Sequence, residues 1–364
     1  MSGNDRNNVS FPRSGDPARH SSRLCMNIAD RLVAAWYAPQ LTLLTAALVP
    51  LSIVFRSAVA LRRTLYRGGL LRSERLPVPI VVVGNLTVGG SGKTPLTIAL
   101  AQALAERGWR PGIVSRGYGG ADRLPRAVEL GSTPDDVGDE PVLLARTGLP
   151  VWVGRNRFVA ARSLLAAHGE CNVIIADDGL QHYAMARTVE IAVVDASRGL
   201  GNGFMLPAGP LREPASRLNE VDAVVRLIST PGSPPTRISA RQSTMVFSGA
   251  SFVRINAPAI VASAASFRSA GVHALAGIGN PQRFFDYLRS LGIDATCHAF
   301  PDHYRFTPAD LALAEAAAIL MTEKDAVKCV AFVDDRCWTL PVRAVVDASL
   351  VTLIEGKLRG FQAA

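Results

Sequence analysis

Residues 79–95, PIVVVGNLTVGGSGKTP, join a run of β-branched residues to a glycine-rich loop. The run at 80–83 predicts a β-strand that is buried on both faces. The residues after the loop, from about Leu96 to Arg107, have the spacing of an amphipathic helix. Glycines let backbone N–H groups turn inward, and a helix N-terminus attracts anions. A strand, such a loop and a helix in this order therefore predict a nucleotide-binding domain of the α/β class.

The loop pattern assigns roles to single residues. We expect Lys93 to reach the β- and γ-phosphates, and the Thr94 hydroxyl to take a coordination position on Mg²⁺. One position departs from the pattern G-x-x-x-x-G-K-[ST], because Thr87 stands where the first glycine is expected. The alternative is a glycine-rich turn without a ligand. The residues expected to bind the nucleotide are Thr87, Val88, Gly89, Gly90, Ser91, Gly92, Lys93 and Thr94.

Carboxylates after a second buried strand would complete a site for a magnesium nucleotide. The apolar run VIIA, residues 173–176, is followed by Asp177 and Asp178. The alternative for these two acids is a surface turn that caps a helix. Another pair, Asp139 and Glu140, precedes a helix-like run. Acids at a helix start stabilise its free N–H groups and its dipole, so this pair predicts either capping or catalysis.

Composition excludes several classes of protein. The chain has 364 residues, of which 48% are hydrophobic and 19% are charged. This is enough for about two domains with a core, and it excludes disordered and collagenous proteins. Five cysteines without a C-x-x-C pair argue against a disulfide scaffold or a zinc site.

The net charge is +9, of which +7 lies in residues 1–75. A nucleic-acid-binding enzyme usually carries basic surface on its folded domains as well, so we expect no nucleic-acid partner.

The basic N-terminal segment predicts contact with a membrane. Residues 32–55 carry no charge, but Pro39 and Pro50 interrupt them. Residues 56–75 interleave arginines with leucines, which is typical of a helix that lies in an anionic membrane interface. We expect this interfacial arrangement. A true membrane span and a helix packed on its own domain remain as alternatives.

Composition shifts divide the chain into four parts. We predict a disordered extension over 1–24, a membrane-associated helical leader over 25–75, a phosphate-loop domain over 76–240 and a smaller second α/β domain with its linker over 241–364. Alternating residues near 244–247 and 252–255 predict linker strands. In the second domain, Lys324 follows an apolar strand-like run and is expected either to line the cleft or to cap a helix.

Eight motifs follow one another in the order of one family: GNLTVGGSGKTP (84–95), SRGYGG (115–120), GDEP (138–141), DDGLQH (177–182), LPAGPLREP (206–214), GIGNPQRFF (277–285), FPDHYRF (300–306) and TEKDAVK (322–328). Through them the chain, from about Trp36 to Lys328, resembles the tetraacyldisaccharide 4′-kinases, the lipid A kinases of Gram-negative bacteria. Residues 1–24 lie outside the resemblance.

The resemblance implies an N-terminal membrane-associated helix and two α/β/α domains, one of them like a P-loop NTPase, joined by a β-ribbon linker. It implies transfer of the ATP γ-phosphate to the 4′-hydroxyl of a tetraacylated glucosamine disaccharide 1-phosphate. The implied cofactors are ATP and Mg²⁺. The implied partners are this lipid A precursor and the cytoplasmic leaflet of the inner membrane, on which a monomer is peripheral or monotopic.

The same resemblance implies roles for the acids and for a histidine. Asp139 is then the base that takes the sugar hydroxyl proton, and His303 is its partner. The implied catalytic residues are Asp139, His303, Lys93 and Asp177. The implied metal ligands are Thr94, Glu140, Asp177 and Asp178.

Two further expectations concern the acceptor and a competing function. Arg155, Arg157 and Arg212 are candidates to face the acceptor's 1-phosphate. A membrane-docked P-loop switch or chaperone NTPase is the rival function. An Asp–His pair distinguishes the two functions, because a switch needs no base aimed at a sugar hydroxyl.

Overall fold

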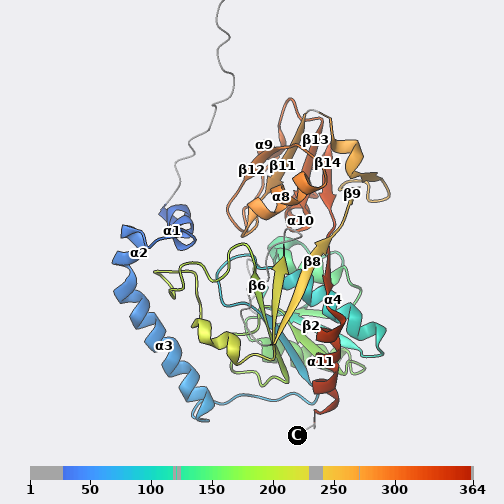
Figure 1. The fold of residues 1–364 in the computed structure, drawn as a ribbon. Helices are drawn as coiled ribbons and strands as arrows, with labels where there is room; N and C mark the ends of the chain where they lie inside the picture. Colours follow the sequence, from blue (N-terminus) through green and yellow to red (C-terminus); the bar gives the residue numbers. More distant parts are fainter. Residues whose placement is uncertain (1–27, 118–119, 121–123, 229–240, 270, 362–364) are drawn as a thin grey trace, which may run out of the picture.

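Two β-sheets form the frame of the molecule (Figure 1). The computed structural model describes residues 28–117, 120, 124–228, 241–269 and 271–361. The strands of the larger sheet are β1 (Ile80–Gly84), β2 (Pro111–Ser115), β3 (Arg126–Ala127), β4 (Val151–Val153), β5 (Val173–Ala176), β6 (Val189–Asp195), β7 (Ala223–Ile228), β8 (Gln242–Ser248) and β15 (Arg343–Val346). Within the described residues their order is β15-β8-β7-β6-β1-β5-β2-β4-β3.

The smaller sheet lies above the larger one in Figure 1. Its strands are β9 (Ser251–Arg254), β10 (Val261–Ser263), β11 (Val272–Ala276), β12 (Thr296–Ala299), β13 (Ala318–Thr322) and β14 (Cys337–Leu340). Their order, over the same residues, is β10-β9-β14-β13-β11-β12. The helices are α1 (Ile28–Trp36), α2 (Leu43–Ala47), α3 (Val49–Arg67), α4 (Lys93–Glu106), α5 (Pro134–Val137), α6 (Asp139–Ala145), α7 (Arg157–Ala167), α8 (Pro281–Ser290), α9 (Pro308–Leu311), α10 (Glu323–Cys329) and α11 (Ala348–Arg359).

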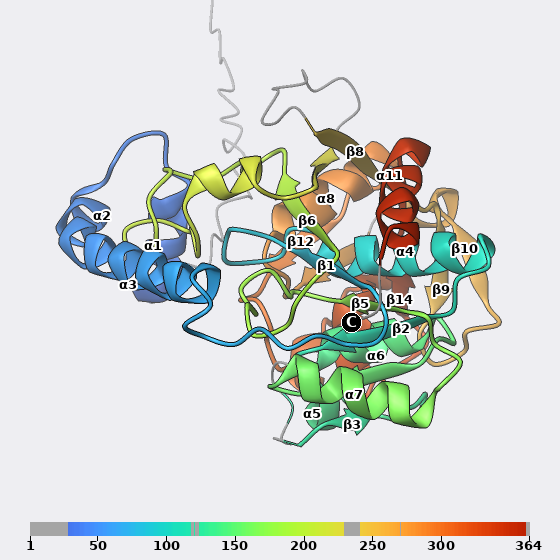
Figure 2. The same cartoon turned by 90° about the horizontal axis from the view of Figure 1, so that it is seen from below.

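Strand β1 is the centre of the larger sheet. It runs parallel to β5 on one side and to β6 on the other, and all its residues are buried. Val81 and Val83 belong to the core formed with α4, α6 and α11, whereas Ile80 and Val82 belong to the core formed with α7. Figure 2 shows the helices on both sides of the sheet. The predicted doubly buried strand and the α/β class are therefore confirmed.

An antiparallel ribbon of β8 and β15 connects the two sheets. The chain leaves the larger sheet after β8, builds the smaller sheet, and returns through β15 into α11. Leu350 and Ile354 of α11 are buried in the core of the larger sheet. The predicted range 241–364 thus includes β8, β15 and α11, which belong to the larger sheet and its core. The alternation at 244–247 indicates a strand but carries no information about which sheet it joins.

The helical leader packs on the larger domain along one side of α3 (Figures 1 and 2). Phe55 and Val59 lie against the core of that domain. Ser52 Oγ donates a hydrogen bond to Met205 O at 2.7 Å, and Trp36 Nε1 donates to Pro207 O at 2.9 Å. These contacts hold the leader against the segment that follows β6.

The other side of the leader exposes large apolar side chains. Leu43 is 92% exposed, and Leu51, Ile53, Val54 and Leu61 are also exposed. In the part of the chain that the structure describes, no helix has the length and apolar character needed to cross a membrane. The predicted extension 1–24 and the loop-like residues 230–236 lie outside the described residues.

Candidate active site

The phosphate loop connects β1 to the first turn of α4. Gly89 and Gly92 have φ angles of 101° and 89°, a left-handed conformation that favours glycine. Lys93 begins α4, so the backbone N–H groups of this turn have no partner within the helix. Ser91 Oγ is buried and has no hydrogen-bond partner among the described residues. A buried unpartnered hydroxyl beside free N–H groups fits an anionic ligand such as a phosphate.

Thr87 and Val88 occupy the outer end of this loop. The backbone N–H of Val88 donates to Pro210 O at 2.9 Å. Thr87 Oγ1 accepts a hydrogen bond from Asn85 Nδ2 at 3.4 Å. Val88 therefore bonds the loop to the backbone at Pro210 and Thr87 bonds it to the side chain of Asn85, while the residues from Gly89 onward surround the start of α4.

Asp177 lies directly after β5 and contacts α4. Thr94 Oγ1 donates to its Oδ2 at 3.1 Å, and Thr97 Oγ1 donates to its Oδ1 at 3.0 Å. Burial, reinforced by the negative charge of Glu140, raises the pKa of Asp177 to about 7. A cation bound beside such a buried carboxylate would stabilise its ionised form.

Asp178 has the opposite electrostatic environment. Arg212 donates to its Oδ2 at 3.1 Å and to its Oδ1 at 2.9 Å, and Lys93 Nζ lies 3.7 Å from Oδ1. Burial opposes ionisation, but the charges of Lys93 and Arg212 hold the pKa of Asp178 well below its usual range. Its φ angle of 49° is rare for a residue with a side chain and is maintained by these contacts. We call Lys93, Thr94, Asp177 and Asp178 the loop cluster.

Asp139 and His303 meet across the two domains. Asp139 begins α6 in the first domain, and His303 lies in the second domain between β12 and α9. Their Oδ2 and Nδ1 atoms are 3.1 Å apart. Burial opposes ionisation of both groups, but their hydrogen bond outweighs it. The pKa of Asp139 is therefore lowered from its ordinary value, and the pKa of His303 is raised from its ordinary value. His303 has a φ angle of 60°, so a strained loop presents the ring.

Lys324 completes this second group of charges. Its Nζ lies 3.1 Å from Glu140 Oε1, 3.2 Å from Asp302 Oδ1 and 3.9 Å from Asp139 Oδ2. The strand-like run before Lys324 predicted a cleft or helix-capping position for this lysine, whereas no local pattern assigned a role to Asp302. The one sequence feature that could have indicated Asp302 is its position directly before His303 in the PDHY motif. We call Asp139, Glu140, Asp302, His303 and Lys324 the interdomain cluster.

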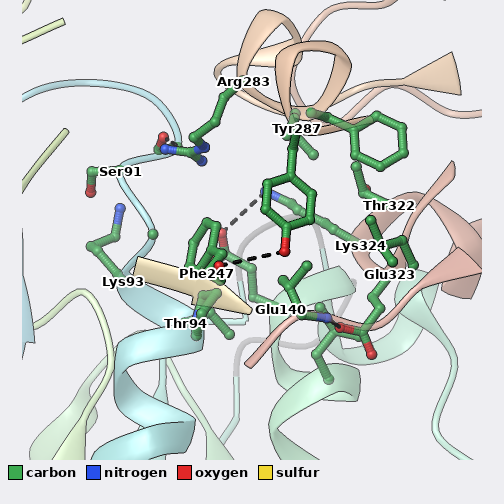
Figure 3. Close-up of a pocket in the computed structure, with 18 of the residues that line it drawn as sticks. Ser91, Lys93, Thr94, Glu140, Phe247, Arg283, Tyr287, Thr322, Glu323 and Lys324 are labelled. Atoms are coloured by element: carbon green, nitrogen blue, oxygen red, sulfur yellow. Dashed lines mark hydrogen bonds and ion pairs between the residues drawn. The ribbon is translucent and has the colours of Figure 1, made fainter. Parts of the chain in front are cut away.

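A cavity lies between the two domains beside the phosphate loop (Figure 3). Lys93 and Thr94 line one part, and Phe247 and Tyr287 contribute aromatic rings to another. Apolar side chains of both domains, including Ile278, complete the walls. The cavity can therefore hold a molecule with a planar apolar part and a charged part.

The phosphate loop also touches the second domain. Gly90 lies so close to Gly279 that a Cβ at Gly279 would overlap the backbone nitrogen of Gly90. Arg283 Nη1 lies 3.0 Å from Asp195 Oδ2, and its Nη2 donates to Gly90 O at 3.4 Å. This contact was not predicted from the sequence. Its available signals were the GIGNPQRFF motif and Asp195 at the end of a buried strand.

The donor set near the loop is of the kind that Mg²⁺ prefers. Among the residues that the structure describes, no three His, Cys, Asp or Glu side chains are grouped so as to hold a metal by themselves. Mg²⁺ usually binds one or two carboxylates together with substrate phosphates. Thr94 and the buried Asp177, whose negative charge is disfavoured by burial and by Glu140, fit such a shared site. Asp178 is already compensated by Lys93 and Arg212.

The three candidate arginines occupy different environments. Arg157 is buried and its Nη2 donates to Asp178 O at 2.6 Å. Arg212 donates to the side chain of Asp178, as described above. Arg155 is exposed. Arg157 and Arg212 therefore support the turn after β5.

Comparison with known proteins identifies the family. The family model described as Tetraacyldisaccharide-1-P 4'-kinase matches residues 44–359. The chain is 51% identical over 321 residues to a protein of Dechloromonas aromatica (strain RCB) named Tetraacyldisaccharide 4'-kinase, covering 87% of this chain and 93% of that protein. It is 50% identical over 313 residues to the protein of the same name from Azoarcus sp. (strain BH72), covering 86% and 91%.

A solved structure agrees with these relatives. The crystal structure of the "apo" form of LpxK from Aquifex aeolicus in complex with ATP superposes with a TM-score of 0.72 at 29% sequence identity. The match covers 87% of this chain and 100% of that chain. The resemblance stated from the motifs is therefore confirmed, and this chain belongs to the tetraacyldisaccharide-1-P 4'-kinase family.

Proposed function

We infer that this chain is an ATP-dependent kinase of lipid A biosynthesis, which transfers the γ-phosphate to the 4′-hydroxyl of a tetraacylated glucosamine disaccharide 1-phosphate. The observation that carries this function is the Asp139–His303 pair, with 3.1 Å between Oδ2 and Nδ1, in a kinase-family chain that also has a phosphate loop. Phosphoryl transfer requires mainly positioning and neutralisation of charge. The two clusters provide both.

We propose that ATP occupies the cavity between the domains. Its triphosphate would lie over the loop that ends in Lys93 and Thr94, where Ser91 Oγ has no partner among the described residues. Its base would lie among the apolar residues that include Phe247 and Tyr287. The lining supports this orientation, because Lys93 and the unpartnered Ser91 hydroxyl lie at the loop, whereas the rings of Phe247 and Tyr287 line another part of the cavity.

We propose that Mg²⁺ is held by Thr94, Asp177 and Glu140 together with phosphate oxygens. When bound, the ion neutralises charge on the β- and γ-phosphates. The raised pKa of Asp177 supports this assignment, since burial and the charge of Glu140 outweigh the opposing charge of Lys93. We assign Asp178 a different role from the one expected. It orients Lys93, and its close contacts with Lys93 and Arg212 support this role.

We propose that Asp139 and His303 act as one unit in accepting the proton. Asp139 Oδ1 accepts a hydrogen bond from Glu140 N at 2.9 Å, and its Oδ2 is bonded to His303. The side chain of His303 is 32% exposed, whereas that of Asp139 is 6% exposed. The acceptor hydroxyl thus gives its proton to His303 Nε2 as its oxygen attacks the γ-phosphorus and ADP leaves. Asp139 orients the ring and stabilises the imidazolium.

We propose that the leader places this site on the cytoplasmic leaflet of the inner membrane, as a peripheral or monotopic monomer without a nucleic-acid partner. The exposed apolar residues of α2 and α3, among them Leu43 and Ile53, support contact with acyl chains. Arginines of α3 would pair with anionic headgroups. An acylated acceptor is itself part of the membrane, so an enzyme docked there meets its substrate.

The test is transfer of label from γ-labelled ATP to the disaccharide 1-phosphate in detergent micelles. We expect labelled lipid in amounts equal to the ADP formed. The rival function, a P-loop switch, predicts ATP hydrolysis with no label on the lipid. That result would overturn the proposed function even if ATP binds.

A further inference from the structure

Lys324 lies where a lysine does not stabilise a helix. It is the second residue of α10, and the N-terminus of a helix carries partial positive charge that repels a cation. The helix is capped by Thr322, whose Oγ1 accepts a hydrogen bond from Asp325 N at 3.2 Å and donates one to Asp325 Oδ2 at 2.6 Å. Of the two roles open for Lys324, helix capping is therefore excluded.

The ammonium group of Lys324 instead reaches carboxylates of both domains. Glu140, 3.1 Å away, is the second residue of α6 in the first domain, and Asp302, 3.2 Å away, precedes His303 in the second. The side chain of Lys324 is only 14% exposed. A buried cation between these acids cancels a repulsion that would otherwise push the domains apart.

The loop that carries His303 depends on the same contacts. Asp302 Oδ1 accepts a hydrogen bond from His303 N at 3.1 Å, and this oxygen also faces Lys324. The loop has the positive φ of His303, a strained conformation that persists only where surrounding contacts hold it. A continuous set of contacts therefore leads from Lys324 through Asp302 and His303 to Asp139. Figure 3 shows Lys324 and Glu140 reaching the cavity from different domains.

We propose that Lys324 is a positioning residue for phosphoryl transfer, which holds the His303 loop of the second domain against the Asp139 end of α6. The proposal rests on the proposed function, in which Asp139 and His303 accept the proton. Lys324 acts through Asp302 and Glu140 and not on the reacting atoms. Its effect is to align a base whose two halves come from different domains.

The test compares Lys324→Met and Lys324→Arg with a control at Lys357, one of the four lysines of the chain. Misplacement of a catalytic group by ~1 Å lowers turnover about 100-fold, and we expect a loss of this size in kcat for Lys324→Met. The dissociation constant of ATP, measured by calorimetry, should change less than about 3-fold, because the phosphate loop is intact. Lys324→Arg should recover kcat to within about 10-fold, since it keeps the cation. Lys357→Met should leave kcat and the dissociation constant of ATP unchanged. Lys357 belongs to α11, and its Nζ pairs with Asp222 Oδ1 at 2.7 Å and with neither charged cluster of the site.

A double-mutant cycle with Asp302→Asn tests whether Lys324 affects turnover through its contact with Asp302. If Lys324 acts through Asp302, the double variant should lose little more activity than either single variant. The single Asp302→Asn variant breaks the same link and serves as the test should Lys324→Met fail to fold. Additive losses would overturn the proposal.

Two other outcomes separate this proposal from the proposed function. If Lys324→Met weakens ATP binding tenfold or more while kcat at saturation stays normal, Lys324 is a nucleotide ligand and the positioning role is wrong. If Asp139→Asn is inactive and Lys324→Met keeps its kcat, only the positioning role is wrong. Absence of lipid phosphorylation by the unmodified chain would instead overturn the proposed function.

Discussion

The two charged clusters of the site are assembled in different ways. The loop cluster lies within one domain, where neighbouring parallel strands β1 and β5 end at the same edge of the sheet. The interdomain cluster joins the start of α6 to a loop and a helix of the other domain. The first is therefore preorganised by the sheet, whereas the second depends on how the domains meet. This difference suggests that binding of nucleotide and alignment of the base can be disrupted independently.

The largest expected effect comes from comparing one acid of each cluster. Asp139→Asn should lower kcat by about 10³-fold, because it disables the Asp139–His303 unit that accepts the proton and general-base catalysis contributes about 10²–10⁴-fold, with little change in ATP affinity. Asp177→Asn should lower kcat and also raise the Mg²⁺ concentration needed for half activity by about 10-fold or more. Steady-state kinetics at varied ATP and Mg²⁺ measure both. Equal losses of ATP affinity in the two variants would show that the clusters do not have separate roles.

An intermediate effect is expected at the contact between the phosphate loop and the second domain. A Cβ in Gly279→Ala would overlap Gly90 N, so the domains could no longer approach as closely. We expect kcat/KM to fall about 10–100-fold, as for other small displacements of catalytic groups. Gly356→Ala is the matched control, since nothing lies within 4 Å of its added Cβ. Replacing a glycine inside α11 should raise the free energy of unfolding by about 0.5–1 kcal/mol. Full activity of Gly279→Ala would mean that this close contact is not needed for turnover.

The smallest effect concerns the protonation of His303. Its pKa lies above the ordinary value of 6.5, because the hydrogen bond to Asp139 outweighs the burial that lowers it. Asp139→Asn removes the negative partner and leaves the burial, so the pKa of His303 should fall. A histidine-selective NMR titration of both proteins, each assigned with a His303→Gln spectrum, measures the shift. An unchanged or higher midpoint in Asp139→Asn would show that the pair is not formed in solution.

Local patterns predicted the parts of the site that depend on local structure. The strand, loop and helix around 79–107 appear in the predicted order, although α4 begins at Lys93 and not near Leu96. Asp177 and Asp178 lie at a strand end as expected, because apolar β-branched runs are buried and their ends reach the edge of the sheet. The pairing of Asp139 with His303 was named only through the family resemblance. Residues 164 apart in sequence carry no local signal of contact.

The amino-acid sequence alone determined the family, the α/β class, the phosphate loop and the acids after β5, since each follows from contiguous residues whose spacing has a direct physical consequence. Only the tertiary structure decided that β8, β15 and α11 belong to the larger sheet and its core, that Lys324 lies between acids of both domains, and that Gly90 lies against Gly279. These contacts depend on how the two sheets and the helices that cover them pack against each other. That approach is set by the summed packing and charge of residues far apart in the chain, which no single segment encodes.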